Sequence, residues 1–115
     1  MIKSKFLEQQ FFNKMKKIIF FLFFLFFCNL VIADPKMDLG IDVYNNKAQC
    51  GTCHTLKAAE SEGKIGPDLD FLKPEIDQII YVVTNGIGVM QAWEGILTSE
   101  EIEAVAYYVF NSTNK

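Results

Sequence analysis

The stretch Cys50-Gly51-Thr52-Cys53-His54 decides how the rest of this chain is interpreted. It places two thiols three positions apart and an imidazole directly after the second thiol. His54 is the only histidine of the chain, and the one other cysteine, Cys28, lies in a distant segment. The question is therefore what two thiols and one imidazole at this spacing can bind together.

Two thiols at this spacing can each form a thioether with one of the two vinyl groups of a haem. The histidine that follows at once is then brought beneath the iron as its proximal ligand. The sequence therefore predicts one covalent haem c, attached through Cys50 and Cys53 and ligated by His54.

Three other readings of the motif are weaker. A structural zinc site takes four ligands, and there is no second Cys-x-x-Cys pair here. A thioredoxin-type redox pair lies at a strand-to-helix turn, and no strand alternation surrounds Cys50. A disulfide between Cys50 and Cys53 would close a very small loop and stabilise little.

The second axial ligand follows largely by elimination. With a single histidine, two imidazoles from one molecule cannot bind the iron. After residue 33 the chain has two methionines, Met37 and Met90. Met37 lies too close to the attachment segment, whereas Met90 falls in a later loop that can approach the opposite haem face. A methionine usually fills gaps in a core, but a haem that lacks its distal ligand favours Met90.

The first third of the chain is typical of an export signal. Lysines flank Met15, an unbroken apolar run follows over 18–27, and Val31-Ile32-Ala33 fits a signal-peptidase site. We therefore expect residues 1–33 to be a signal segment, cleaved after Ala33, and residues 34–115 to be the functional domain. Met15 is a second candidate for the true start.

An uncleaved membrane anchor is the alternative for this segment. Its apolar stretch reaches only about 15 residues, short of the roughly 20 that a spanning helix needs. Phe27 stands before Cys28 where a lipoprotein signal has a small residue, so we expect Cys28 to be removed with the signal. These features predict a periplasmic location.

Residues 34–115 are strongly acidic. They hold six lysines against thirteen aspartates and glutamates, a net charge of −7. Such a domain is a poor ligand for nucleic acid or anionic lipid and favours protein partners with a basic docking patch. We expect a monomer that does not span the membrane.

Helical periodicity accounts for most of this domain. A short helix is expected over 38–49, and 55–70 should be mostly loop. Pro74 suits the first turn of a second helix, which Asn85-Gly86 should end. Thr98 and Glu101 form a capping box that opens the last helix. The predicted class is all-α, and so few helices leave a core that a haem would fill.

The chain resembles the class I mono-haem c-type cytochromes of the short bacterial type. Gly40 and Tyr44 resemble the glycine and aromatic residue at which the first helix of that family crosses the last, and Tyr108 is the matching aromatic residue. The resemblance implies the small cytochrome c fold, with about three to four short helices around one covalent haem.

Two further stretches carry the resemblance. Gly66-Pro67-Asp68-Leu69 is similar to a family segment whose proline carbonyl accepts a hydrogen bond from the proximal histidine and whose leucine packs on the haem. The approach to Met90 is also similar, but Gln91 stands where the family usually has proline, which should loosen the loop. Trp93 fits as a wall of the haem pocket.

Iron held by histidine and methionine has no open position for a small ligand, and the thioether raises its potential. The sequence shows no acid–base pair or nucleophile, so we expect an electron carrier rather than an enzyme. A freely diffusing periplasmic shuttle between respiratory redox partners is the first hypothesis. A dedicated cytochrome subunit of a periplasmic dehydrogenase is the second, and a haem-based sensor the third.

Overall fold

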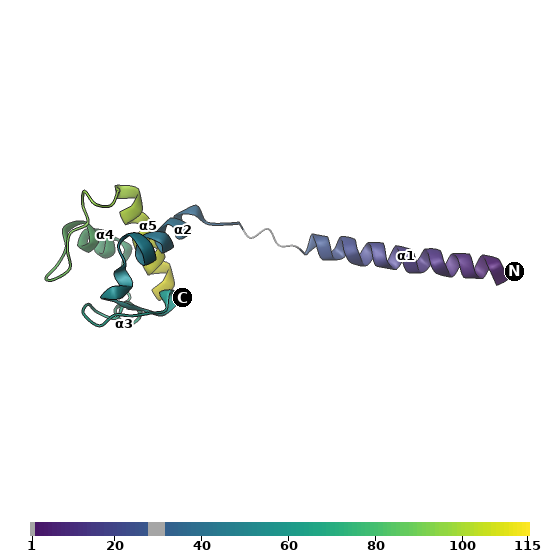
Figure 1. Cartoon of the computed structure of the whole chain (residues 1–115), viewed down its shortest axis with the longest axis horizontal. Coiled ribbons are helices and arrows are strands. Elements are labelled where there is room, and N and C mark those ends of the chain that lie inside the picture. The colour runs from purple at the N-terminus through teal and green to yellow at the C-terminus, as the bar shows by residue number, and fades with distance from the viewer. Residues whose placement is uncertain (1, 28–31) are drawn as a thin grey trace. The chain divides into compact units, whose positions relative to one another are not determined.

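The structure is a computed structural model that describes residues 2–27 and 32–115. It divides into two compact units, 1–32 and 33–115 (Figure 1). Cys28 and Val31, which the sequence interpretation assigns to the signal and its cleavage site, lie outside the described residues.

The first unit is one helix, α1 (Ile2–Phe26). It begins well before Met15, and all of its described side chains are exposed. Among the described residues, none of the helices combines the length and the apolar character needed to cross a bilayer.

The second unit is built from short helices and one small hairpin, which confirms the predicted all-α class. Its α-helices are α2 (Pro35–Asp42), α3 (Leu69–Leu72), α4 (Ile76–Asn85) and α5 (Ser99–Thr113). A π-helical turn, η1 (Val43–Lys47), and two 3₁₀ turns, η2 (Cys50–Thr52) and η3 (Lys57–Ala59), connect them. Strands β1 (Thr55–Leu56) and β2 (Ser61–Glu62) pair antiparallel, Thr55 opposite Glu62.

The first helix of this unit starts earlier than predicted. Asp34 is its N-cap and accepts hydrogen bonds from the amides of Lys36 and Met37, while Pro35 occupies the first turn. This start was missed because the apolar spacing begins only at Leu39. The helix then widens into the π turn η1. The predicted segment 38–49 therefore contains the end of an α-helix followed by a π-helical turn.

The prediction that Pro74 lies in the first turn of the second helix is wrong. Glu75 is the N-cap of α4, and its amide donates to Gln78 Oε1 at 3.1 Å. Pro74 therefore lies before the helix. The predicted end is confirmed, because Gly86 terminates α4 with φ at +71°, a value that favours glycine.

The capping box of the last helix is confirmed. The Glu101 amide donates to Thr98 Oγ1 at 3.2 Å, and the Thr98 amide donates to Glu101 Oε2 at 2.9 Å. The other carboxylate oxygen of Glu101 pairs with Lys47, the last residue of η1. The start of α5 is thereby linked to the turn that leads into the Cys-x-x-Cys-His segment.

Helices α2 and α5 cross at Gly40, as the resemblance implied. A Cβ at this position would lie 2.2 Å from the Ala104 carbonyl oxygen and 2.7 Å from Tyr108 Cβ. Only a residue without a side chain allows this approach. Beside the crossing, the rings of Tyr44 and Tyr108 meet edge to face at 5.6 Å, and both tyrosines are buried.

The core lies where these helices meet. Tyr44, Leu56 and Val43 are the largest of its fully buried side chains. Helix α4 adds Ile79 and Val83, and α5 supplies much of the remainder. Because Leu56 comes from the segment just after His54, the core extends directly to the predicted attachment site.

Replacing Gly40 by alanine should destabilise the haem-bearing protein by about 1–3 kcal/mol or more, because the new methyl group meets the α5 backbone. Guanidinium unfolding gives the free energy. Asp38→Ala, on an exposed position of the same helix, is the control and should cost less. Equal losses in the two variants would contradict the close crossing.

Tyr44 should make the fold sensitive to alkaline pH. Burial raises its pKa to about 12, partly offset by the hydrogen bond with Ser61. A raised pKa contributes stability that is complete below the ordinary value of 10.0 and is lost as pH rises through 12. Tyr44→Phe should therefore lose less unfolding free energy than the wild type across this window, by up to about 2 kcal/mol. Tyr81→Phe, at an exposed tyrosine, should behave as the wild type.

Candidate functional site

The Cys-x-x-Cys-His segment forms one tight turn. Gln49 introduces it with a left-handed backbone, at φ +49°. The Cys50 carbonyl then accepts hydrogen bonds from the amides of Cys53 at 3.1 Å and of His54 at 3.0 Å. These bonds keep both thiols and the imidazole on one short turn, which is the arrangement that attachment to a single porphyrin requires.

The state of the thiols argues against a redox dithiol. Cys50 and Cys53 are unpaired and partly buried. Burial raises the pKa of the Cys50 thiol to about 11. Reactive dithiols instead have a lowered pKa that supplies thiolate at neutral pH. In the described residues, no group of three or more histidine, cysteine, aspartate or glutamate side chains converges to hold a metal ion.

The hydrogen bond expected from His54 to Pro67 is present. His54 Nδ1 lies 2.8 Å from the Pro67 carbonyl oxygen. A carbonyl oxygen can only accept, so the proton must be on Nδ1, and Nε2 keeps its lone pair. Such a bond orients the ring and raises the basicity of the ligating nitrogen. This bond therefore leaves Nε2 as the ring nitrogen that could bind a metal.

Gly66 holds the ring of His54 from one side. A Cβ at Gly66 would lie 2.5 Å from His54 Cε1 and 2.8 Å from Nδ1. The Gly66 amide also donates to the Cys53 carbonyl at 2.8 Å. The imidazole thus packs directly on the backbone of the segment that accepts its proton.

Met90 lies in a closed turn between α4 and α5. The amides and carbonyls of Ile87 and Met90 exchange two hydrogen bonds, at 3.1 and 2.9 Å. Past the turn, the Trp93 amide donates to the Val83 carbonyl at 2.9 Å, which ties the loop to α4. These bonds connect the residues on both sides of Gln91 to the turn and to α4.

The predicted pocket residues gather around one apolar cluster. Leu69 is buried within it, and Cys50, Met90 and Trp93 pack against it while partly exposed. The loop around Met90 also carries exposed apolar side chains, with Val89 87% exposed and Ile87 64%. His54 and Pro67 are held beside this cluster by their mutual hydrogen bond.

These residues fit a covalent haem. The donor set contains two thiols for the vinyl groups, an imidazole nitrogen with a free lone pair and a thioether sulfur, together with an apolar cluster suited to a porphyrin. No other described part of the chain combines these groups.

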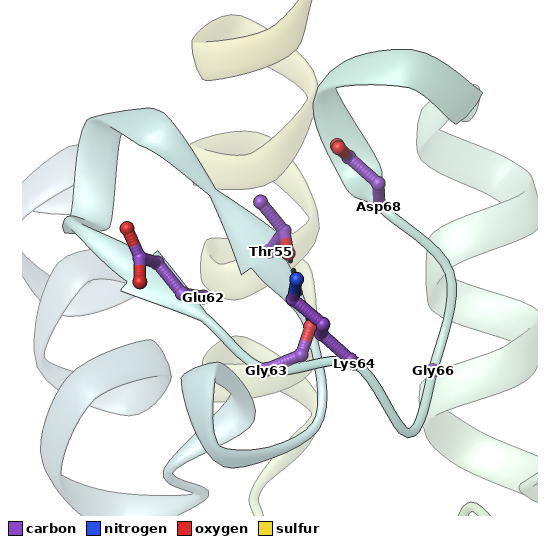
Figure 2. A pocket seen from close by; sticks show the side chains of 6 residues that line it. All are labelled: Thr55, Glu62, Gly63, Lys64, Gly66 and Asp68. Atoms are coloured by element: carbon purple, nitrogen blue, oxygen red, sulfur yellow. Dashed lines mark hydrogen bonds between the residues drawn. The ribbon is translucent and has the colours of Figure 1, made fainter.

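A hollow of about 480 Å³ lies next to this site but has different chemistry (Figure 2). Hairpin residues Thr55, Glu62, Gly63 and Lys64 form one side and Gly66 and Asp68 the other. The Thr55 hydroxyl donates to the Gly63 carbonyl at 3.0 Å. The lining contains no large apolar side chain, so the hollow is unsuited to a porphyrin.

Two residues of the site were missed by the sequence interpretation. Gln49 supplies the left-handed turn before Cys50, a role usually taken by glycine or asparagine. Asp70 accepts a hydrogen bond from the Lys57 amide at 2.7 Å. Neither role has a sequence signal, because one is a backbone conformation and the other joins α3 to the turn η3 across thirteen positions.

Comparison with known proteins gives a consistent result. Residues 35–109 match the family model described as "Cytochrome C oxidase, cbb3-type, subunit III". Cytochrome c6 of Tetradesmus obliquus is 33% identical over 87 residues, which cover 67% of this chain and 93% of the relative. Cytochrome c6 of Porphyra purpurea is 35% identical over 114 residues, covering 88% of this chain and 98% of the relative.

A solved structure agrees with these relatives. The crystal structure of the c-type cytochrome SorU from Sinorhizobium meliloti superposes with a TM-score of 0.65 at 49% identity. The match covers 70% of this chain and 93% of that one.

Gly66→Ala should disturb the imidazole without straining the backbone, because Gly66 has no positive φ and the atoms nearest to the new methyl group belong to the His54 ring. We expect a lower thermal midpoint and a shifted reduction potential in the haem-bearing protein, with a cost of about 1–3 kcal/mol. Ile65→Ala, at the exposed neighbouring position of the same loop, is the control and should leave both quantities nearly unchanged. A potential unchanged in Gly66→Ala would contradict the contact with the ring.

Proposed function

Because this chain belongs to the c-type cytochrome family matched by residues 35–109, and so carries one covalent haem c, we propose that it is a periplasmic shuttle for single electrons with iron held by His54 and Met90. The cytochrome c fold predicted from the sequence is confirmed by the same comparisons. As a member of this family the protein is an electron carrier, not an enzyme.

The observation that supports this assignment best is the hydrogen bond from His54 Nδ1 to the Pro67 carbonyl. It fixes the tautomer, so Nε2 is the nitrogen left for iron. Cys50 and Cys53, on the same turn, would supply the two thioether bonds. When bound, the haem supplies an iron that changes its charge by one electron.

Met90 is the proposed second ligand. Its loop is closed by paired hydrogen bonds and its side chain packs against the core cluster, so the sulfur can be held without a large rearrangement. With His54 and Met90 both bound, the iron has no open position. The chain's role is then to hold both ligands in place during electron transfer, while the apolar cluster excludes water from the haem.

The proposed location depends on the N-terminal segment. The basic residues beside Met15 and the apolar run over 18–27 support export, and cleavage after Ala33 would release residues 34–115. Asp34, the first residue after this cut, caps α2 and also accepts a hydrogen bond from the Tyr107 hydroxyl at 3.1 Å. These contacts of Asp34 within the second unit support cleavage just before it.

The partners of this family are redox proteins, and the net charge of this domain narrows the kind of surface that such a partner would present. With a net charge of −7 over residues 34–115, we propose partners that present a basic surface. Steered encounters of this kind weaken as salt screens the charges. We propose that the protein is a monomer in solution.

A dedicated cytochrome subunit of a periplasmic dehydrogenase is the second candidate. The matched family model is described as a subunit of an oxidase, which supports a place in a larger complex although not the dehydrogenase itself. Size exclusion of the native protein from its source separates the two. Elution as a small monomer supports the shuttle, whereas a stable large complex supports the subunit.

Met90→Ala should abolish the near-infrared sulfur–iron band and lower the reduction potential, because the thioether ligand is lost. The reduced variant should also bind carbon monoxide at neutral pH, which the wild type should not. Met37→Ala is the matched control, a partly buried methionine that also packs on the core. An unchanged band in Met90→Ala would exclude Met90 as a ligand, and carbon monoxide binding by the wild type would favour a sensor.

A further inference from the structure

Three hydrogen bonds join the segment around His54 to the segment around Pro67, and each joins residues thirteen positions apart. The Gly66 amide donates to the Cys53 carbonyl at 2.8 Å, and His54 Nδ1 donates to the Pro67 carbonyl at 2.8 Å. The Lys57 amide donates to Asp70 Oδ2 at 2.7 Å. Along each of the two segments, the bond made by His54 lies between the other two bonds.

The acceptor of the His54 bond belongs to a short piece of chain with little stability of its own. Pro67 is followed by α3, a single turn of four residues, and so short a helix depends on tertiary contacts. Asp68 caps it by accepting from the Phe71 amide at 3.2 Å, and Leu69 anchors it in the core. Leu69 shares the core cluster with Leu56 of β1, so α3 packs on the segment that follows His54, but neither contact is a hydrogen-bonded tie between the two.

Asp70 provides that tie. Its carboxylate, which is only partly exposed, reaches across from α3 to the Lys57 amide at the end of the segment that His54 begins. A hydrogen bond to an ionised acceptor is shorter and stronger than one to a neutral acceptor. It is also the only one of the three bonds whose acceptor is a side chain, so it can be removed without changing the backbone or the ligand.

We propose that Asp70 is a positioning residue for the proximal ligand: by clamping α3 to the Lys57 amide, it keeps the Pro67 carbonyl in place to accept from His54 Nδ1. This inference rests on the proposed role of His54 as iron ligand. A held Nδ1–H···O bond makes Nε2 a stronger donor, which favours oxidised iron. Asp70 therefore lowers the reduction potential through the ring of His54 in addition to its own charge.

The test compares Asp70→Ala with Asp70→Asn in the haem-bearing protein. Both variants remove the negative charge, but asparagine keeps an oxygen that can accept from Lys57. We expect the Lys57 amide and the His54 Nδ1 proton to exchange about tenfold faster in Asp70→Ala than in Asp70→Asn. The potential should rise in both variants, and further in Asp70→Ala. A role in stability alone would not separate the two potentials.

Asp70→Glu keeps the charge and moves the acceptor oxygens, so it keeps the test decisive where alanine prevents folding. The His54 Nδ1 proton should exchange faster in Asp70→Glu than in Asp70→Asn, although Asp70→Glu keeps the wild-type charge. Two results would overturn the proposal. One is that the alanine and asparagine variants have equal His54 exchange and equal potentials. The other is that His54 exchanges more slowly in the glutamate variant than in the asparagine variant. A wild-type protein without the spectrum of histidine–methionine haem would instead overturn the proposed function.

Discussion

The hydrogen bond between His54 and the Pro67 carbonyl connects the parts of this domain that the sequence keeps apart. It selects the tautomer of the chain's single imidazole, and the Gly66 backbone limits the position of the ring. Because this bond joins two loops rather than two helices, both loops must be held by other contacts. Leu56 anchors one of them in the core and Leu69 the other. The helices thus form a frame that holds the two loops in position.

That frame depends on the crossing of α2 and α5. Gly40 lets the two backbones approach, and Tyr44 and Tyr108 fill the space beside the crossing. Helix α2 continues into the π turn η1, and η1 leads through the left-handed Gln49 to Cys50. The thiols are therefore placed by the helix crossing, whereas the imidazole is oriented by the loops. A haem bound to both would connect these two parts of the domain.

Much of this arrangement was predictable, and the misses have physical reasons. Capping chemistry at Thr98 and Glu101 acts over three residues and could be read directly. The missing proline at Gln91 suggested a loose loop, but hydrogen bonds such as that from the Trp93 amide to the Val83 carbonyl depend on tertiary placement. The two-residue strands β1 and β2 are too short for a periodic signal. The bond of Asp70 joins α3 to η3, two elements distant in the sequence, so it appears only once the chain has folded.

The account stands on one porphyrin joined to both thiols of the attachment turn. The most direct test is to purify the protein from a host competent in cytochrome maturation, denature it in acidified acetone and treat it with a thiol-alkylating reagent before mass analysis. We predict a coloured chain whose mass includes one haem and in which Cys50 and Cys53 do not react. A colourless chain without the mass of a haem, with both cysteines alkylated, would contradict the account.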